Sequence, residues 1–372
     1  MAINRLENVT TSAQGTTASP ESFAQYSSRM SMRLALPTGG IVALLVILLN
    51  TDRGLVPLSD DLRSFGTLAF FAMLPLSAIT AGWAYILGIR GWNDRVRPER
   101  QRSWYFGFLP VALAYMLVTA GLLVIGITLI ERAFRELQLS LVQGTLLAVL
   151  GSTAFTFWVV GDAMRLDTRK LLTLVVVILA SGVYLTLIAI DDPQWWRVSF
   201  SYLGKLESNV NWLFNATLIF TGILLLIWYS YFMSDYGILL RHGIADARWA
   251  MVIRVGLLWI GVGVMIVGLF KSQLTPFSSL MHNTAAYSMA GVFLLFMLGA
   301  RWIAPGFPAE FHALSVTVVA VLIGTIAWAI SGGVNTVGME MTVFVLGLMW
   351  LSQFARNTEN LAIEQEPEAF VK

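Results

Sequence analysis

The chain contains no cysteine, and only three of its 372 residues are histidines: His242, His282 and His312. Disulfides, thiol nucleophiles and thiolate metal sites are therefore excluded. With so few imidazoles, we expect no metal site and no cofactor. Charged residues make up 12% of the chain, against about 25% in a soluble domain. The net charge of +2 is too small to indicate a nucleic-acid partner.

Apolar sequence is what the chain has in abundance: 57% of its residues are hydrophobic and its mean hydropathy is +0.72. A helix needs about 20 apolar residues to cross a bilayer, and backbone polar groups in lipid must be satisfied within helices. The sequence therefore predicts an all-α, polytopic integral membrane helical bundle with about ten transmembrane helices. The predicted spans are residues 34–51, 65–89, 105–130, 141–162, 171–190, 211–233, 250–270, 284–300, 312–330 and 341–355.

Positive charge is distributed unevenly between the two sides of these spans. An even number of spans places both termini on one side, and most of the 24 Lys and Arg residues fall on that side. Cytoplasmic loops carry an excess of Lys and Arg. We therefore expect a multi-pass protein of the cell (plasma) membrane with both termini in the cytoplasm.

Polar segments flank the spans, and a short basic turn divides them. Residues 1–33 are rich in Ser, Thr, Gln and Asn, and are expected to form a disordered cytoplasmic tail. Residues 356–372 are rich in glutamate and are expected to form an acidic cytoplasmic tail. A basic turn around 164–172 separates a four-span N-terminal block, residues 34–166, from a six-span block, residues 167–355.

Polar side chains at three outer ends of the spans are the candidate functional residues. A polar side chain at the edge of hydrocarbon is costly unless it faces protein, a wet cavity or a partner. Interhelical hydrogen bonding is the structural alternative to a ligand site. The predicted ligand-binding residues are Ser199, Ser201, Asn211, Asn215, His282, Asn283 and Glu340.

The chemistry of this set depends on spacing and on pKa. Asn211 and Asn215 are four residues apart and share one helical face. His282 is the only histidine on the outer side, and an imidazole titrates near neutral pH, so it could carry a proton. Glu340 opens the last span and could pair with His282 if the two spans are neighbours.

The six-span block resembles the bacterial membrane family known as domain of unknown function 998, which is similar to the eukaryotic DRAM/Frag/Sfk group. The resemblance covers about half of the chain and rests on the stretch SFSYLG (199–204) with Asn211 or Asn215, on His282-Asn283 and on Glu340. Tyr202 departs from the pattern, since relatives often place an acidic residue there. The resemblance implies membrane lipids as partners, because the eukaryotic group is associated with lipid remodelling and membrane stress.

Three functions are compatible with these residues. The first is a non-enzymatic protein whose outer polar pocket binds a lipid headgroup or another membrane protein. The second is an intramembrane lipid hydrolase or transferase with Ser201 as nucleophile, His282 as base and Glu340 as orienting group, although no G-x-S-x-G elbow is present. The third is a transporter of small solutes or lipid. No ionisable residue sits mid-span to support it.

Because the chain has no native cysteine, its orientation can be tested with single cysteines. A His282→Cys variant should react with a membrane-impermeant thiol reagent added outside intact cells. An Arg248→Cys variant, in a predicted cytoplasmic loop, should react only after permeabilisation. Labelling of position 282 from the cytoplasm alone would remove the basis for an outer polar site.

Overall fold

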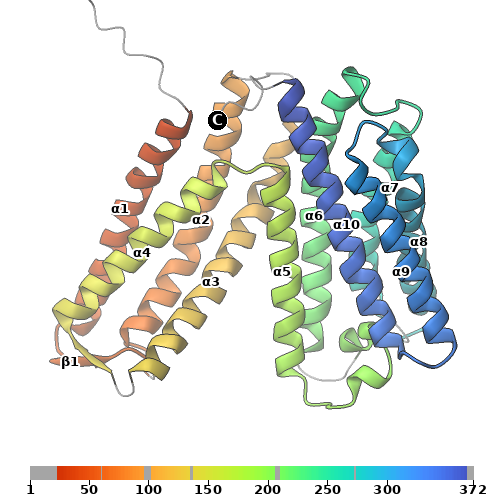
Figure 1. Ribbon diagram of the computed structural model, residues 1–372. Helices are drawn as coiled ribbons and strands as arrows, with labels where there is room; N and C mark the ends of the chain where they lie inside the picture. Colours follow the sequence, from red (N-terminus) through yellow and green to blue (C-terminus); the bar gives the residue numbers. More distant parts are fainter. Residues whose placement is uncertain are drawn as a thin grey trace, which may run out of the picture.

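The computed structural model describes residues 23–59, 61–95, 102–134, 137–205, 210–271 and 274–366. Over these ranges, ten helices are long and apolar enough to cross a membrane, which confirms the predicted all-α polytopic bundle (Figure 1). They are α1 (Phe23–Asn50), α2 (Phe65–Arg95), α3 (Phe108–Ala133), α4 (Leu141–Ala163), α5 (Thr168–Ala189), α6 (Asn211–Arg241), α7 (Ala250–Leu269), α8 (Pro276–Ile303), α9 (Ala309–Ile330) and α10 (Thr336–Gln365). The shorter elements are β1 (Leu55–Pro57), β2 (Gln138–Ser140), η1 (Arg102–Gly107), η2 (Trp195–Arg197) and η3 (Phe200–Gly204).

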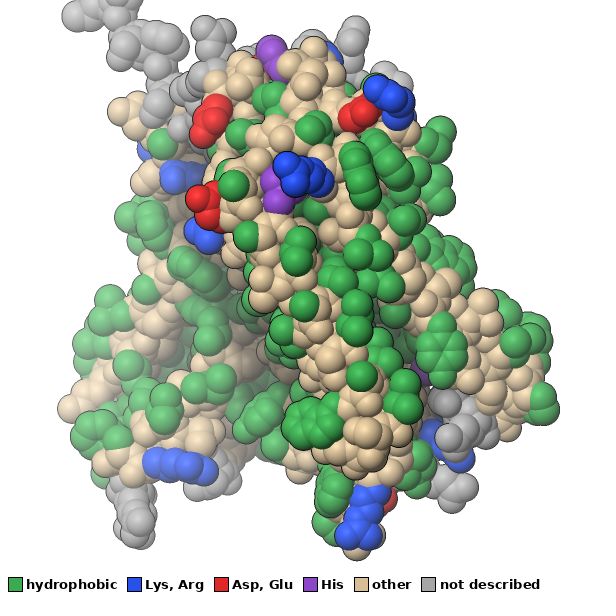
Figure 2. All heavy atoms as spheres, turned by 45° about the vertical axis from the view of Figure 1, so that its right-hand side comes forward, with side chains coloured by type: hydrophobic (Ala, Val, Ile, Leu, Met, Phe, Trp, Pro, Cys, Tyr) green, Lys and Arg blue, Asp and Glu red, His purple; other side chains and the backbone are tan. Residues whose placement is uncertain are grey.

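The bundle has two polar ends. Helix α1 begins and α10 ends at the same end, which we call the terminal face; we call the opposite end the loop face (Figure 1). Figure 2 shows hydrophobic side chains over the middle of the bundle, with charged side chains gathered toward both ends. Such a band is what hydrocarbon requires, because charged groups are costly within it.

Helix α1 begins at Phe23 rather than near residue 34, so residues 23–33 are helical and the predicted disordered tail is wrong for them. The side chains of Phe23, Ser27, Ser31 and Ala35 recur at four-residue spacing and are all buried. The Ser31 hydroxyl donates to the Ser27 carbonyl at 2.9 Å, so this buried donor is satisfied within the helix. Residues 1–22 lie outside the described part of the chain.

The acidic segment after residue 355 is likewise part of the bundle up to Gln365. Glu359 is 2% exposed and accepts hydrogen bonds from the Arg169 backbone N–H (3.1 Å) and Nε (3.0 Å). Glu366 accepts from Arg241 at 2.8 Å and lies 3.3 Å from the His242 ring. Over residues 356–366, the expected acidic tail is therefore a helix end docked by ion pairs, while residues 367–372 lie outside the described ranges.

The helices pack as two neighbouring groups (Figure 1). Helix α1 packs on α4, and α2 packs on α3 and α4. Helix α6 packs on α5 and α7, while α10 packs on α5, α6 and α9. The separation of residues 34–166 from 167–355 as domains stays a prediction.

The two groups meet near the terminal face through an aromatic joint formed by Tyr85, Trp104 and Tyr231. The Trp104 and Tyr231 rings stack with centroids 3.9 Å apart. The Tyr231 hydroxyl donates to the Tyr85 hydroxyl at 3.2 Å, which donates to the Trp104 carbonyl at 2.8 Å. An ion pair between Lys170 Nζ and Asp162 Oδ1 (2.8 Å) joins α5 to α4 at the same level.

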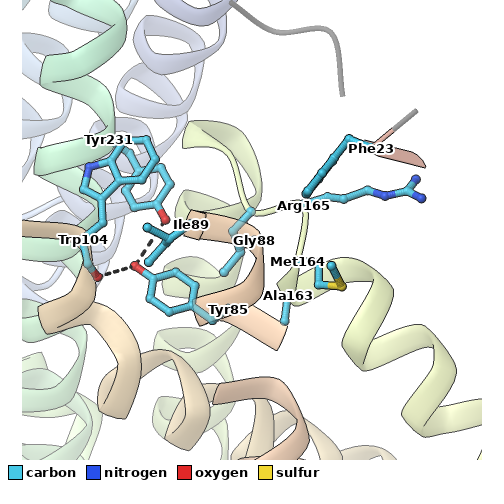
Figure 3. A pocket seen from close by; sticks show the side chains of 10 residues that line it. Phe23, Tyr85, Gly88, Ile89, Trp104, Ala163, Met164, Arg165 and Tyr231 are labelled. Carbon is cyan, nitrogen blue, oxygen red and sulfur yellow. Dashed lines mark hydrogen bonds between the residues drawn. The ribbon is translucent and has the colours of Figure 1, made fainter. Parts of the chain in front are cut away.

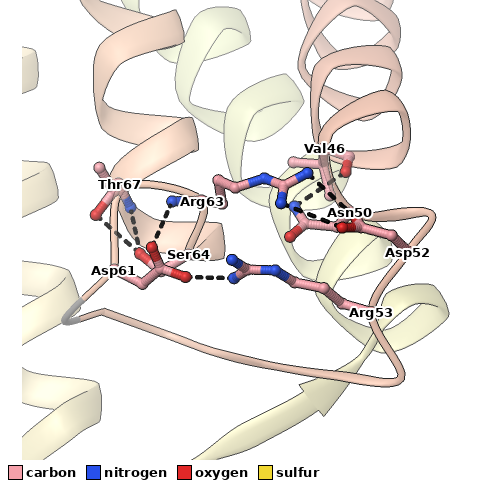
Figure 4. Close-up of polar contacts among 8 residues, drawn as sticks. All are labelled: Val46, Asn50, Asp52, Arg53, Asp61, Arg63, Ser64 and Thr67. Atoms are coloured by element: carbon pink, nitrogen blue, oxygen red, sulfur yellow. Dashed lines mark hydrogen bonds and ion pairs between the residues drawn. The ribbon is translucent and has the colours of Figure 1, made fainter.

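The loop face of the first group is closed by a small antiparallel sheet in which Val56 of β1 pairs with Leu139 of β2. Ion pairs of Arg53 with Asp61 and of Arg63 with Asp52 brace the loop beside it (Figure 4). The Arg53 guanidinium, hydrogen-bonded to Asp61, holds the pKa of that carboxyl below its usual value. The loop therefore keeps this pair charged down to acidic pH.

The buried pair between α5 and α10 can be tested in the purified protein. A Glu359→Gln change should weaken two hydrogen bonds to a charged acceptor and destabilise the fold by about 1–3 kcal/mol. Thermal unfolding in detergent measures this as a lower Tm. Glu364→Gln, at an exposed position five residues along the same helix, is the matched control and should leave the Tm unchanged. Equal Tm values for the two variants would show that the pair does not stabilise the helix end.

Candidate polar site on the loop face

Glu340 connects the start of α10 to the loop that precedes α6. Its Oε2 accepts a hydrogen bond from the Phe200 backbone N–H at 2.5 Å. Asn335 caps α10 by accepting from Gly338 N at 2.8 Å, and its Nδ2 donates to the Trp196 carbonyl at 3.2 Å. Asn335 and Glu340, both at the start of α10, thus hold the same loop between α5 and α6.

The stretch 199–204 forms a short helix, η3, on this face. The hydroxyls of Ser199 and Ser201 lie 3.2 Å apart, within hydrogen-bond distance. Leu203 is fully buried, and the Phe200 ring packs edge-on against Phe214 with centroids 5.6 Å apart. The apolar residues of this stretch therefore anchor it to the bundle and leave its two serines at the half-buried edge.

Asn215 fixes the end of η3 to α6. Its Nδ2 donates to the Gly204 carbonyl at 3.0 Å and to the Asn211 carbonyl at 3.2 Å. A Cβ on Gly204 would lie 2.5 Å from Asn215 Oδ1, so the contact requires glycine at this position. Asn211 and Asn215 share a helical face as predicted, and Asn215 acts there as a structural clamp.

His282 is 5% exposed and is oriented by the end of α7. Its Nδ1 lies 2.8 Å from the Phe270 carbonyl and 3.2 Å from the Val267 carbonyl. Since carbonyls only accept hydrogen bonds, Nδ1 carries a proton and donates it to the end of α7. Asn283 is exposed on α8, so the side chains of this adjacent pair face different surroundings.

The proposed catalytic residues are not joined to one another by hydrogen bonds. Ser201 bonds to Ser199, and Glu340 accepts from the Phe200 backbone. His282 lies close enough to Glu340 for an electrostatic interaction. Among the described residues, no hydrogen bond or ion pair links Ser201, His282 and Glu340. We call Ser199, Ser201, Asn215, His282 and Glu340 the loop-face cluster.

Sequence reasoning missed Asn335 and the backbone groups that the cluster holds. The signal for Asn335 was present: an asparagine directly before an apolar helical run is a preferred N-cap. No sequence signal marks the backbone partners, which are the N–H of Phe200 and the carbonyls of Gly204 and Phe270. Almost every residue has such backbone groups.

Comparisons with protein-family models, with curated proteins and with solved structures each returned no match. The resemblance to the domain of unknown function 998 family therefore stays a prediction that rests on the residues quoted above.

The role of Glu340 in holding the loop predicts different results for two substitutions. Glu340→Gln keeps an oxygen acceptor for the Phe200 N–H, whereas Glu340→Ala removes it. Amide hydrogen exchange over residues 199–204 should quicken about tenfold in the alanine variant and change little in the glutamine variant. Equal exchange in the wild-type protein and the alanine variant would show that this hydrogen bond does not hold the loop.

Proposed function

We propose that the chain is a non-enzymatic, multi-pass plasma-membrane protein, with both termini cytoplasmic, whose loop-face cluster binds a lipid headgroup on the outer side. The ten apolar helices support the membrane assignment. The resemblance to the domain of unknown function 998 family supports lipid as the ligand, with another membrane protein as the alternative partner.

The observation that carries this proposal is the half-buried carboxylate of Glu340 at the mouth of α10. Its hydrogen bond from the Phe200 N–H leaves further acceptor capacity on the carboxylate, which has about four lone-pair sites. A carboxylate at the level of the headgroups suits a lipid that carries an amine, such as phosphatidylethanolamine.

A hydrolase is less well supported by this geometry. Triad chemistry needs a hydrogen bond from nucleophile to base and another from base to orienting group. The Ser201 hydroxyl bonds to Ser199 instead, and His282 is oriented by backbone carbonyls. Transport is not supported by a charged site in the middle of any span that the structure describes.

Lipid binding can be tested by retention of phosphatidylethanolamine in native mass spectrometry. Glu340→Gln keeps the loop contact but removes the charge, and should lower retention about tenfold. Asn283→Ala, next to His282 but exposed, is the control and should bind as the wild-type protein does. Unchanged retention in Glu340→Gln would overturn this site.

The same preparation separates the alternative functions. We expect no release of fatty acid or headgroup from the phospholipid. Turnover that is lost in both Ser201→Ala and His282→Ala would establish the hydrolase instead. Uptake of labelled solute into proteoliposomes would establish transport. Because His282 is buried, Asn283→Cys is also the better position for labelling from the outside.

A further inference from the structure

The two helix groups are joined at the terminal face. The chain passes from the first group (α1–α4) to the second (α5–α10) once, in the turn between α4 and α5. Between described residues of the two groups, the hydrogen bonds and ion pairs lie at this face: Tyr231 donates to Tyr85, and Lys170 pairs with Asp162. Figure 3 shows the chain of hydrogen bonds from Tyr231 through Tyr85 to the Trp104 carbonyl, with the Trp104 and Tyr231 rings stacked.

One face of α3 changes from buried to exposed along the length of the helix. Its residues lie three or four positions apart, so they form a single strip: Val111, Tyr115, Val118, Leu122, Ile125 and Leu129. The first two, nearest the terminal face, are 0% and 2% exposed, and the third is partly buried against the core shared by both groups. The last three are 46%, 56% and 62% exposed. The strip therefore loses its cover step by step toward the loop face.

Helix α5 shows the same change on the face that carries Lys170, the partner of Asp162. On this face Leu174 is 8% exposed, Val177 is 41% exposed and Ile188, near the loop face, is 62% exposed. Both helices thus begin in contact with the other group and separate from it toward the loop face, as Figure 1 shows for α3 and α5.

At the loop face, each group is closed by its own bonds. In the first group, β1 pairs with β2, and the Arg53–Asp61 ion pair braces the loop beside them. In the second, Glu340 and Asn335 hold the loop between α5 and α6. Among the residues that the structure describes, no hydrogen bond or ion pair joins the two groups at this end. Units that share a small interface move relative to one another by default.

We infer that the protein is a hinge whose two helix groups rock about the aromatic joint and the turn between α4 and α5. The terminal ends stay together, while the wedge between α3 and α5 widens and narrows in the loop-face half of the membrane. The exposed part of the α3 strip is entirely apolar, so lipid hydrocarbon covers it when the groups are apart. Movement there breaks no hydrogen bond between described residues, so it leaves no polar group unpaired in the membrane. The inference does not depend on a ligand at the loop-face cluster.

The test is double electron–electron resonance between spin labels on paired cysteines, with the full chain in lipid nanodiscs. The chain has no native cysteine, so each pair is unambiguous. Leu129→Cys with Ile188→Cys reports on the loop-face half, and Leu109→Cys with Thr173→Cys reports on the terminal half; all four positions are exposed. The distance distribution of the loop-face pair should be about twice as broad as that of the terminal pair.

Pairs within one group measure the breadth that the labels alone produce. Leu129→Cys with Leu146→Cys lies within the first group, and Ile188→Cys with Val345→Cys lies within the second. These pairs reuse the two labelled sites of the loop-face pair, and all their positions are exposed. A loop-face distribution no broader than those of the within-group pairs would overturn the inference.

A second experiment tests whether the joint is the hinge. Tyr231→Phe removes the hydroxyl that donates to Tyr85 but keeps the ring on Trp104, and Lys170→Met removes the ion pair to Asp162. Together they should broaden the distribution of the terminal pair and leave the within-group pairs unchanged. Arg248→Gln, which changes a 90% exposed side chain, is the control and should change none of them.

An unchanged terminal pair in the Tyr231→Phe, Lys170→Met variant would show that the joint does not hold the two groups together, and would overturn its role as the hinge. If the double variant does not fold, Lys170→Met alone decides the question, because this side chain is part-exposed and its loss leaves the aromatic joint intact. Equal broadening in Arg248→Gln would likewise count against the joint. Lipid retention at Glu340 is measured separately, so this inference and the proposed function can fail independently.

Discussion

The structure depends on one constraint: a polar group placed in hydrocarbon must find its partner within the protein. Helix formation meets this requirement for the backbone of all ten spans. Hydroxyl side chains meet it by donating to the carbonyl one turn back, as Thr119 does to Tyr115 at 2.6 Å. Carboxylates meet it with a partner from another helix, as Glu359 does with Arg169. Exceptions among the described residues include Thr156, Thr221 and Trp228, each of which has a buried polar side-chain atom without a hydrogen-bond partner.

The same constraint shapes the loop-face cluster. Glu340, Asn215 and His282 each bond to the backbone of a neighbouring segment. These bonds position the side chains, and the Glu340 carboxylate keeps acceptor capacity beyond its bond to Phe200. Our proposal of headgroup recognition rests on that remaining capacity, which suits it better than a proton relay through Ser201.

At the terminal face, the same constraint shapes the junction between the two helix groups. The aromatic joint and the Asp162–Lys170 pair connect the two helix groups with their polar atoms engaged. The buried residues of α3 all lie between Val111 and Thr119, in the half of the helix nearest this face. Beside the joint, Arg165 donates to the Ser27 hydroxyl and the Ala24 carbonyl and so ties the turn between α4 and α5 to α1.

Sequence alone determined that this is a ten-span helical bundle, because hydropathy over about 20 residues is a local property. It also singled out Asn215, His282 and Glu340 as polar residues that needed partners. It misjudged the ends of α1 and α10, since buried serines and a paired Glu359 look solvated when their partners are unknown. Tertiary structure decided those partners, because contacts such as Phe200–Glu340 and Arg169–Glu359 join residues more than a hundred positions apart.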